Sequence, residues 1–211
     1  MKVHVIGMGY IGLPTAVFFA RAGFEVSGSD IDSSRIEALQ NGILHFAEPS
    51  FDELFQSVLD EGQLRFVSQV ESADVFIICV PTPVVESSGS RIADLSHLWD
   101  AVDSLVPCLE EGALVIVEST VPVGTTEKVA DRLTGRRSDL LELRFAYAPE
   151  RVLPGSLVTE MAENSRIVGG VDEYSSRGAL DLYRRLTDAQ VESVDSNTAE
   201  MAKLVENSFR D

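Results

Sequence analysis

The sequence predicts an α/β protein built on a doubly wound, mostly parallel β-sheet with helices on both faces. Short apolar runs alternate with helical patterns along all 211 residues, as expected when a crossover helix follows each strand. The runs at residues 75–80 and 113–117 are continuously apolar, which is typical of parallel strands buried on both faces. The run at residues 2–6 ends in three closely spaced glycines, and a helical pattern follows at once.

Apolar periodicity and turn residues place the elements along the chain. Strands are expected at residues 2–6, 24–30, 64–67, 75–80, 113–117, 144–148, 166–168 and 191–194. Helices are expected to end near residue 23, to begin near residues 33, 126 and 197, and to cover residues 51–59, 95–106 and 172–186. Residues 84–92 are expected to form a polar surface loop, and a hinge between the two halves is placed near residues 130–145.

Charge and cysteine content restrict the class of protein. The chain carries 34 acidic and 17 basic residues, a formal net charge of −17, which argues against nucleic acid or an anionic membrane as partner. A phosphate-bearing ligand would therefore need local hydrogen-bond donors. Two cysteines do not make a disulfide framework, and no apolar run approaches the roughly 20 residues needed to span a bilayer. A cytoplasmic protein is expected, and no metal site is predicted.

The first glycines have the spacing of a dinucleotide-binding motif in a Rossmann-type fold. Gly7 permits a tight turn out of the strand, Gly9 lets the backbone approach a pyrophosphate, and Gly12 lets the helix pack close to the strand. The first helical turn would present its amides and its positive dipole end to the phosphates. The alternative is a glycine-rich strand-to-helix turn without a ligand.

Asp30 stands at the end of the second expected strand, 18 residues after Gly12. An acidic residue about 20 residues beyond the glycines takes the ribose hydroxyls of NAD and repels the extra phosphate of NADP. Arg35 complicates this preference, because a nearby arginine can accept that phosphate; with Asp30 present, we expect it along the adenosine. The alternative for Asp30 is a purely structural helix N-cap.

Hydroxyl side chains follow two further buried strands. Thr82 lies between two prolines after residues 75–80, and Thr120 follows residues 113–117. Ligands of open α/β sheets bind at the carboxyl ends of strands, so both hydroxyls are candidates for cofactor binding. Thr125 and Thr126 could equally cap the next helix. Cys79 is interpreted as a packed strand residue.

The last expected helix carries a column of polar side chains. Glu200, Lys203, Asn207 and Arg210 fall within an arc of roughly 80° on one helix face. The alternative is a solvated face with one ion pair, worth at most about 0.5 kcal/mol. The helix reaches Asp211 without a C-terminal signal, so we expect a chain cut within an element.

Several of these segments together resemble the UDP-glucose/GDP-mannose dehydrogenase family. They are GMGYIGLPTA, CVPTP, ESTVPVGTTE, APERVLPG, IVGG and TAEMAKLVENSFRD, in this order. PERVLPG and ENSFRD resemble in particular the UDP-N-acetyl-D-mannosamine dehydrogenase branch. The resemblance implies that residues 1–195 form the NAD-binding Rossmann-type domain with a smaller C-terminal βαβ extension. Residues 196–211 would begin the family's central dimerisation helix, which is truncated here.

The resemblance also implies roles for individual residues. Those expected to hold NAD are Gly7, Gly9, Tyr10, Ile11, Gly12, Asp30, Arg35, Thr82 and Thr120. Those expected on the sugar side are Glu150, Arg151, Val152, Lys203, Asn207 and Arg210. Lys203 would act as general acid/base or oxyanion partner with Asn207 beside it, and Glu150 would handle the hydrolytic water. Arg151, Val152 and Arg210 would contact the substrate.

Family members oxidise C6 of a nucleotide sugar twice, from alcohol to carboxylate, with two NAD. The second step uses a cysteine nucleophile in the C-terminal half, and nothing in this sequence matches it, so the fragment is expected to be inactive alone. The full-length enzyme is expected to be a homodimer acting on a UDP-sugar. The alternatives are oxidation of UDP-N-acetylglucosamine or UDP-glucose, a β-hydroxyacid dehydrogenase, and a non-catalytic nucleotide-binding module.

Overall fold

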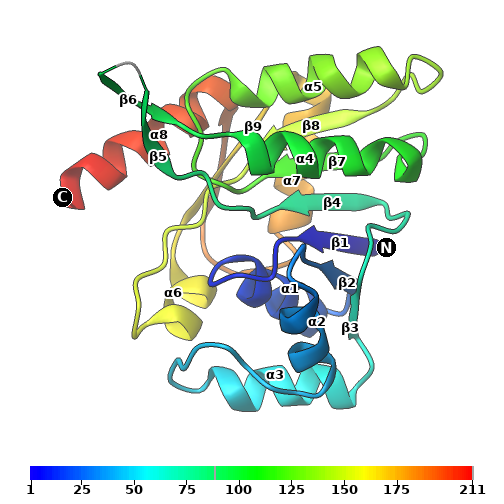
Figure 1. Ribbon diagram of the computed structural model, residues 1–211, viewed down its shortest axis with the longest axis vertical. Coiled ribbons are helices and arrows are strands. Elements are labelled where there is room, and N and C mark those ends of the chain that lie inside the picture. The colour runs from blue at the N-terminus through cyan, green and yellow to red at the C-terminus, as the bar shows by residue number, and fades with distance from the viewer. Residues whose placement is uncertain (88, 211) are drawn as a thin grey trace.

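One eight-stranded sheet runs through the molecule in the order β10-β9-β8-β7-β4-β1-β2-β3 (Figure 1). The computed structural model describes residues 1–87 and 89–210. All neighbouring strands of this sheet are parallel except the β8–β9 pair. The strands are β1 (Lys2–Ile6), β2 (Glu25–Ser29), β3 (Leu64–Val67), β4 (Val75–Ile78), β7 (Leu114–Val117), β8 (Arg144–Tyr147), β9 (Arg166–Gly170) and β10 (Val191–Asp195). The predicted doubly wound, mostly parallel sheet is confirmed.

Helices cover both faces of the sheet and separate two apolar cores. The helices are α1 (Gly12–Arg21), α2 (Ser33–Gln40), α3 (Phe51–Asp60), α4 (Ser96–Leu105), α5 (Thr125–Arg136), α6 (Leu157–Glu163), α7 (Glu173–Tyr183) and α8 (Ser196–Arg210). Side chains of α1, α2, α3, α6 and α7 pack on one face, and those of α4, α5 and α8 pack on the other. Within β4, Ile77 belongs to the first core while Phe76 and Ile78 belong to the second, as the alternation of a strand requires.

The sequence prediction is wrong for two segments. Where a loop was expected at residues 84–92, the described residues form two antiparallel strands, β5 (Val84–Ser87) and β6 (Ser90–Ala93), with Val85 opposite Ile92. The β-branched residues of these strands, Val84, Val85 and Ile92, favour strands, but they do not alternate with polar residues, so the sequence signal is weak. The short helix α6 was also missed.

Helix α8 is attached to α5 through a buried carboxylate. Glu200 has no exposed surface and accepts hydrogen bonds from the amides of Gly124 (2.6 Å) and Thr126 (2.8 Å) and from Thr126 Oγ1 (2.6 Å). The carboxylate thus satisfies amides at the N-terminus of α5, where negative charge is stabilised. The Thr125 hydroxyl donates to the carbonyl of Pro122 instead of capping the helix. The solvated-face alternative is therefore wrong for Glu200, and also for Lys203, which is buried.

The expected division at residue 195 and the hinge near residues 130–145 remain predictions. The main sheet continues without interruption from β3 to β10. Across residues 1–87 and 89–210, no helix has the length and apolarity needed to cross a membrane.

The contact between Glu200 and α5 makes a testable contribution to stability. We expect Glu200→Ala to lower the free energy of unfolding by about 2 kcal/mol, because buried helix-terminal donors lose their acceptor. Urea denaturation followed by circular dichroism measures this. Asp131→Ala, which removes an exposed carboxylate from α5 itself, is the control and should change stability by less than about 0.5 kcal/mol. Equal effects of the two substitutions would contradict the capping role.

Candidate functional site

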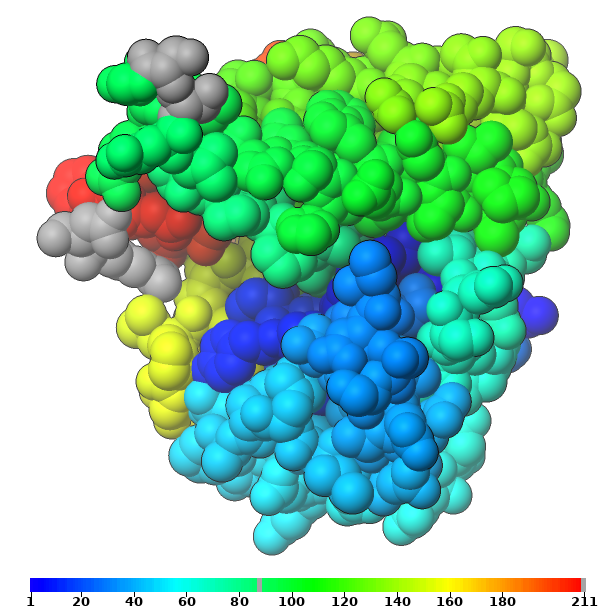
Figure 2. Space-filling view, viewed as in Figure 1, coloured from blue at the N-terminus to red at the C-terminus, as the bar shows by residue number. Residues whose placement is uncertain are grey.

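A cleft of about 920 Å³ lies at the carboxyl ends of β1, β2, β4 and β7. In Figure 2 this face is hollowed between the blue N-terminal residues and the green residues that follow β4. The residues expected at the site that line it are Gly7, Gly9, Tyr10, Ile11, Asp30, Arg35, Thr82, Thr120, Glu150, Val152 and Lys203. The predicted cofactor-side and sugar-side residues therefore share one continuous cavity.

Each glycine of the motif has its own geometric reason. Gly7 has a φ of +94°, and a Cβ there would lie 2.4 Å from the carbonyl oxygen of Cys79. A Cβ on Gly12 would lie 1.8 Å from the carbonyl oxygen of Gly7, so only glycine lets α1 begin this close to the strand. No atom lies within 4 Å of a Cβ built on Gly9, which faces the cleft. Gly9 is thus not required by the fold but leaves room for a ligand.

The N-terminus of α1 is available to an anion. Its N-cap residue Ile11 provides no capping side chain, and its first turn contains no acidic residue. The positive end of the helix dipole and its amides therefore have no competing carboxylate from the helix itself. Together with the open position at Gly9, this arrangement suits the pyrophosphate of a dinucleotide.

Asp30 connects the glycine loop to the segment after β2. Its Oδ2 accepts hydrogen bonds from the amide of Met8 (2.7 Å) and from Arg35 Nη1 (2.9 Å), and its Oδ1 accepts from the amide of Asp32 (2.9 Å). The N-cap of α2 is Asp32, whose carboxylate accepts from the amides of Ser34 and Arg35. The N-cap alternative for Asp30 is therefore wrong, and Arg35 lies beside Asp30 on the wall of the cleft.

The tips of β4 and β7 are joined by side-chain hydrogen bonds. Thr82 Oγ1 donates to the carbonyl oxygen of Thr120 at 2.6 Å, and Ser119 Oγ donates to the carbonyl oxygen of Val80 at 2.7 Å. The hydroxyl proton of Thr82 is therefore engaged within the protein, and toward a ligand this hydroxyl can only accept a hydrogen bond.

A buried carboxyl group that the sequence analysis did not single out forms part of the cleft floor. Glu118, directly after β7, accepts a hydrogen bond from Thr15 Oγ1 of α1 (2.8 Å) and contacts Cys79 Sγ (3.4 Å). Burial, followed by the nearby charge of Glu150, raises the pKa of Glu118 to about 8. Burial and then Glu118 likewise raise the pKa of the Cys79 thiol, which supports its interpretation as a packed residue.

Glu150 is held by a buried ion pair. Its Oε2 lies 2.7 Å from Arg166 Nη1 of β9, and its Oε1 accepts from the amide of Arg151 at 2.7 Å. Arg166 also donates to the carbonyl of Met161 (2.9 Å) and lies over the ring of Tyr183. Both charged side chains are about 95% buried, so removing either one would leave an uncompensated charge. Arg166 was missed because an arginine at the start of a strand carries no specific signal.

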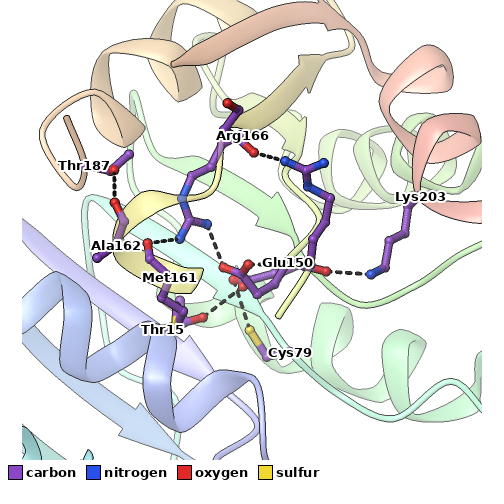
Figure 3. A network of polar contacts seen from close by, with 11 residues as sticks. Thr15, Cys79, Glu150, Met161, Ala162, Arg166, Thr187 and Lys203 are labelled. Carbon is purple, nitrogen blue, oxygen red and sulfur yellow. Dashed lines mark hydrogen bonds and ion pairs between the residues drawn. The ribbon is translucent and has the colours of Figure 1, made fainter. Parts of the chain in front are cut away.

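Lys203 reaches this cluster from α8. Its Nζ donates to the carbonyl oxygen of Glu150 at 2.6 Å. Figure 3 shows Thr15 of α1, Cys79 just after β4, Arg166 of β9 and Lys203 of α8 lying around Glu150. Helix α8 can approach because β9 carries Gly169, where a Cβ would lie 2.8 Å from Cβ of Ala199.

The structure does not bring every expected sugar-side residue into the cleft. In the part of the chain that it describes, neither Arg151 nor Asn207 is among the lining residues. The guanidinium of Arg151 donates to the carbonyl of Ser165 and lies 4.0 Å from the carboxylate of Glu206. The side chain of Arg210 lies outside the described residues.

Comparisons with known proteins agree with this geometry. Residues 1–187 match the model of the NAD-binding domain of the UDP-glucose/GDP-mannose dehydrogenase family. A UDP-N-acetyl-D-mannosamine dehydrogenase of Methanococcus vannielii is 42% identical over 100% of this chain and 48% of its own length. The structure of UDP-D-ManNAc dehydrogenase from Pyrococcus horikoshii has a TM-score of 0.94 at 42% identity, covering 100% of this chain and 50% of that one. For a UDP-N-acetyl-mannosamine dehydrogenase of Staphylococcus aureus, the TM-score is 0.93 at 38% identity, with coverage of 100% and 51%. The chain thus spans about half the length of the relatives it matches.

The open position at Gly9 separates ligand binding from folding. We expect Gly9→Ala to weaken NAD binding at least about tenfold, or ~1.4 kcal/mol, because its methyl group would occupy space left for the pyrophosphate. Its thermal unfolding should match that of the wild type, since no protein atom lies near the new Cβ. Isothermal titration calorimetry and thermal melts measure the two effects. Gly135→Ala, an equally open glycine on α5, is the control and should leave NAD affinity unchanged. Unaltered affinity in Gly9→Ala would argue against a phosphate at this loop.

Protonation of Glu118 predicts a pH-dependent stability. The unfolded carboxyl group ionises above its ordinary pKa of 4.5, whereas the folded one keeps its proton until about pH 8. Between these values the folded state binds more protons, so wild-type stability falls as pH rises, by up to about 1.4 kcal/mol per pH unit from this group. Glu118→Gln, which cannot ionise, should therefore gain stability relative to wild type from pH 5 to pH 8 in urea titrations. The exposed substitution Glu142→Gln should show no such trend, and a constant difference for Glu118→Gln would refute the raised pKa.

Proposed function

We propose that this chain, which belongs to the UDP-glucose/GDP-mannose dehydrogenase family, supplies the NAD-binding half of a UDP-N-acetyl-D-mannosamine 6-dehydrogenase. The observation that carries the proposal is that the glycine loop and Asp30 share one cleft with Lys203 and Glu150. A cofactor bound along the glycine loop and Asp30 would therefore have its other end near Lys203 and Glu150. The relatives support the sugar class, since the named ones at about 40% identity act on UDP-N-acetyl-D-mannosamine.

The cofactor side of the cleft fits NAD. The open Cβ position at Gly9 and the uncapped start of α1 would take the pyrophosphate, and Asp30 would take the ribose hydroxyls. Arg35 pairs with Asp30 and would flank the adenosine. Tyr10, Ile11, Thr82 and Thr120 would complete the cofactor site. When bound there, NAD accepts a hydride from the substrate.

The sugar side of the cleft provides a cation for the oxygen that reacts. The ammonium of Lys203 would stabilise negative charge on the C6 oxygen and exchange a proton with it, a role typically worth about 10²–10⁴-fold in rate. Glu150 positions Lys203 through its backbone carbonyl, whereas its carboxylate is engaged by Arg166. Handling of the hydrolytic water by Glu150 would therefore require a rearrangement of this pair. Val152 would contact the sugar. Asn207 would lie beside Lys203, and Arg151 and Arg210 would contact the substrate.

The second oxidation step needs a thiolate nucleophile. The thiol pKa values of Cys79 and Cys108 are both raised by burial, which disfavours a thiolate at either position. We propose that the nucleophile belongs to the half of the relatives that this chain does not cover. The 211 residues alone would then bind NAD without completing the reaction.

Helix α8 supports a homodimer of the full-length protein. Met201, Val205 and Phe209 recur at every fourth position and are 49%, 49% and 89% exposed. Residues four apart lie on the same helix face, so they form an apolar stripe that a second surface can cover. We also place the protein in the cytoplasm, where free thiols such as Cys79 and Cys108 stay reduced.

Formation of NADH by the full-length enzyme tests the proposed function. We expect turnover with UDP-N-acetyl-D-mannosamine to exceed that with UDP-N-acetylglucosamine or UDP-glucose, with two NADH formed per sugar. Absorbance at the NADH band measures both quantities. A preference for UDP-glucose would contradict the substrate assignment.

The matched variant in this assay is Lys203→Ala. It should reduce turnover at least about 10²-fold while NAD affinity stays the same, because the ammonium acts on the sugar oxygen. Unchanged turnover would leave Lys203 with a structural role only.

A further inference from the structure

A single carboxylate outside the described cleft joins the glycine loop to the sugar-side segment. Glu48, in the segment before α3, accepts a hydrogen bond from the phenol of Tyr10 at 2.5 Å through Oε1. The amide of Gly155 donates to both of its carboxylate oxygens, at 2.9 and 3.0 Å. These three residues are far apart in the sequence, so the carboxylate connects segments that the sheet itself does not join.

Glu48 is a buried carboxylate whose hydrogen-bond donors are neutral groups. Only 8% of its surface is exposed. The hydrogen bonds from Tyr10 and then from Gly155 hold the pKa of Glu48 below its ordinary value. Burial and then Glu48 raise the pKa of the Tyr10 phenol, which keeps this hydroxyl a donor. A buried carboxylate is stable only while such donors are in place, so displacing either one carries a free-energy cost.

The segment that carries Glu48 is held rigidly. The ring of Phe46 lies 5.0 Å from the ring of Tyr10 and stacks at 5.5 Å on Phe51 of α3. Ser50 has a φ of +61°, the only positive φ of a non-glycine residue in residues 1–87 and 89–210. This conformation costs roughly 1–2 kcal/mol for a residue with a Cβ. Its persistence indicates that the surrounding contacts fix the turn beside Glu48.

The two residues that Glu48 contacts, Tyr10 and Gly155, belong to segments that line the cleft. Tyr10 lies between Gly9 and Ile11 and lines the proposed cofactor side. Gly155 closes a turn of the segment that begins at Glu150, whose carbonyl accepts from Lys203. Contacts therefore run from Tyr10 through Glu48 to Gly155, and along that segment to Lys203.

We propose that Glu48 is a positioning residue that couples NAD binding at the glycine loop to the conformation of the sugar-side segment at residues 150–157. The inference rests on the proposed function for the identity of the two ligands. A cofactor that fixes Tyr10 strengthens its hydrogen bond to Glu48, and Glu48 in turn holds the amide of Gly155. Because such coupling is reciprocal, each ligand then tightens the binding of the other.

Amide hydrogen exchange of this 211-residue chain tests the first half of the coupling. We expect saturating NAD to slow exchange about fivefold at residues 153–157, as well as in the glycine loop. In Glu48→Ala, which removes the carboxylate outside the cleft, NAD should still slow exchange in the glycine loop but no longer at residues 153–157. Glu53→Gln, an exposed carboxylate on α3, is the control and should behave as wild type. Equal NAD-dependent protection at residues 153–157 in Glu48→Ala and wild type would overturn the inference.

A double-mutant cycle on the full-length enzyme tests the second half. Calorimetry gives the affinity for NADH, which cannot oxidise the sugar, with and without UDP-N-acetyl-D-mannosamine, and we expect the sugar to tighten NADH about fivefold in wild type. Tyr10→Phe, Glu48→Ala and the double variant should each lose this factor to the same extent, since they interrupt one connection. A purely structural Glu48 would lower the melting temperature but leave the factor intact, which would overturn the inference. A wild type that binds no NAD overturns the proposed function and the inference with it, whereas binding without coupling overturns only the inference.

Discussion

The site depends on a close approach between two backbones, the loop after β1 and the tip of β4. Gly7 lies so near the carbonyl of Cys79 that no side chain fits between them, and Gly12 lies still closer to the carbonyl of Gly7. This packing sets the start of α1 directly above the end of the sheet. It also brings Thr15, one turn into the helix, within hydrogen-bond distance of Glu118 at the tip of β7. A constraint on two glycines, Gly7 and Gly12, thus determines both the N-terminal end of α1 and the floor of the cleft.

The opposite wall of the cleft depends on two contacts that position α8. Gly169 lets the helix approach β9, and Glu200 attaches it to the N-terminus of α5 through a buried carboxylate. Only one turn separates Glu200 from Lys203, so the attachment also fixes where the ammonium lies. The position of the ammonium on this wall therefore follows from the contacts that α8 makes with α5 and β9.

Local patterns predicted most of the sheet and most of the residues that we propose for the cofactor side of the cleft. The glycine spacing and Asp30 were found because their signal lies within a few residues of a strand end. Glu48, Glu118 and Arg166 were not, because each acts through partners elsewhere in the chain, such as Gly155, 107 residues from Glu48. The same holds for Glu200, which looks like an exposed helix residue until α5 is placed against it. Patterns of period two and 3.6 report burial and not which distant polar groups meet.

A protein with a net charge of −17 can present a cleft to a phosphate-bearing ligand because the carboxyl groups at its strand ends are compensated one by one. Asp30 is paired with Arg35, Glu150 is paired with Arg166, and Glu118 keeps its proton at neutral pH. The two ion pairs act within 3 Å, where they outweigh the screened field of distant surface charges. Removing any one of the partners would restore a negative charge beside the ligand. The acidic surface is therefore compatible with a cleft for a phosphate-bearing ligand. Short-range contacts set the charge inside the cleft, whereas the charges on the surface are distant and screened.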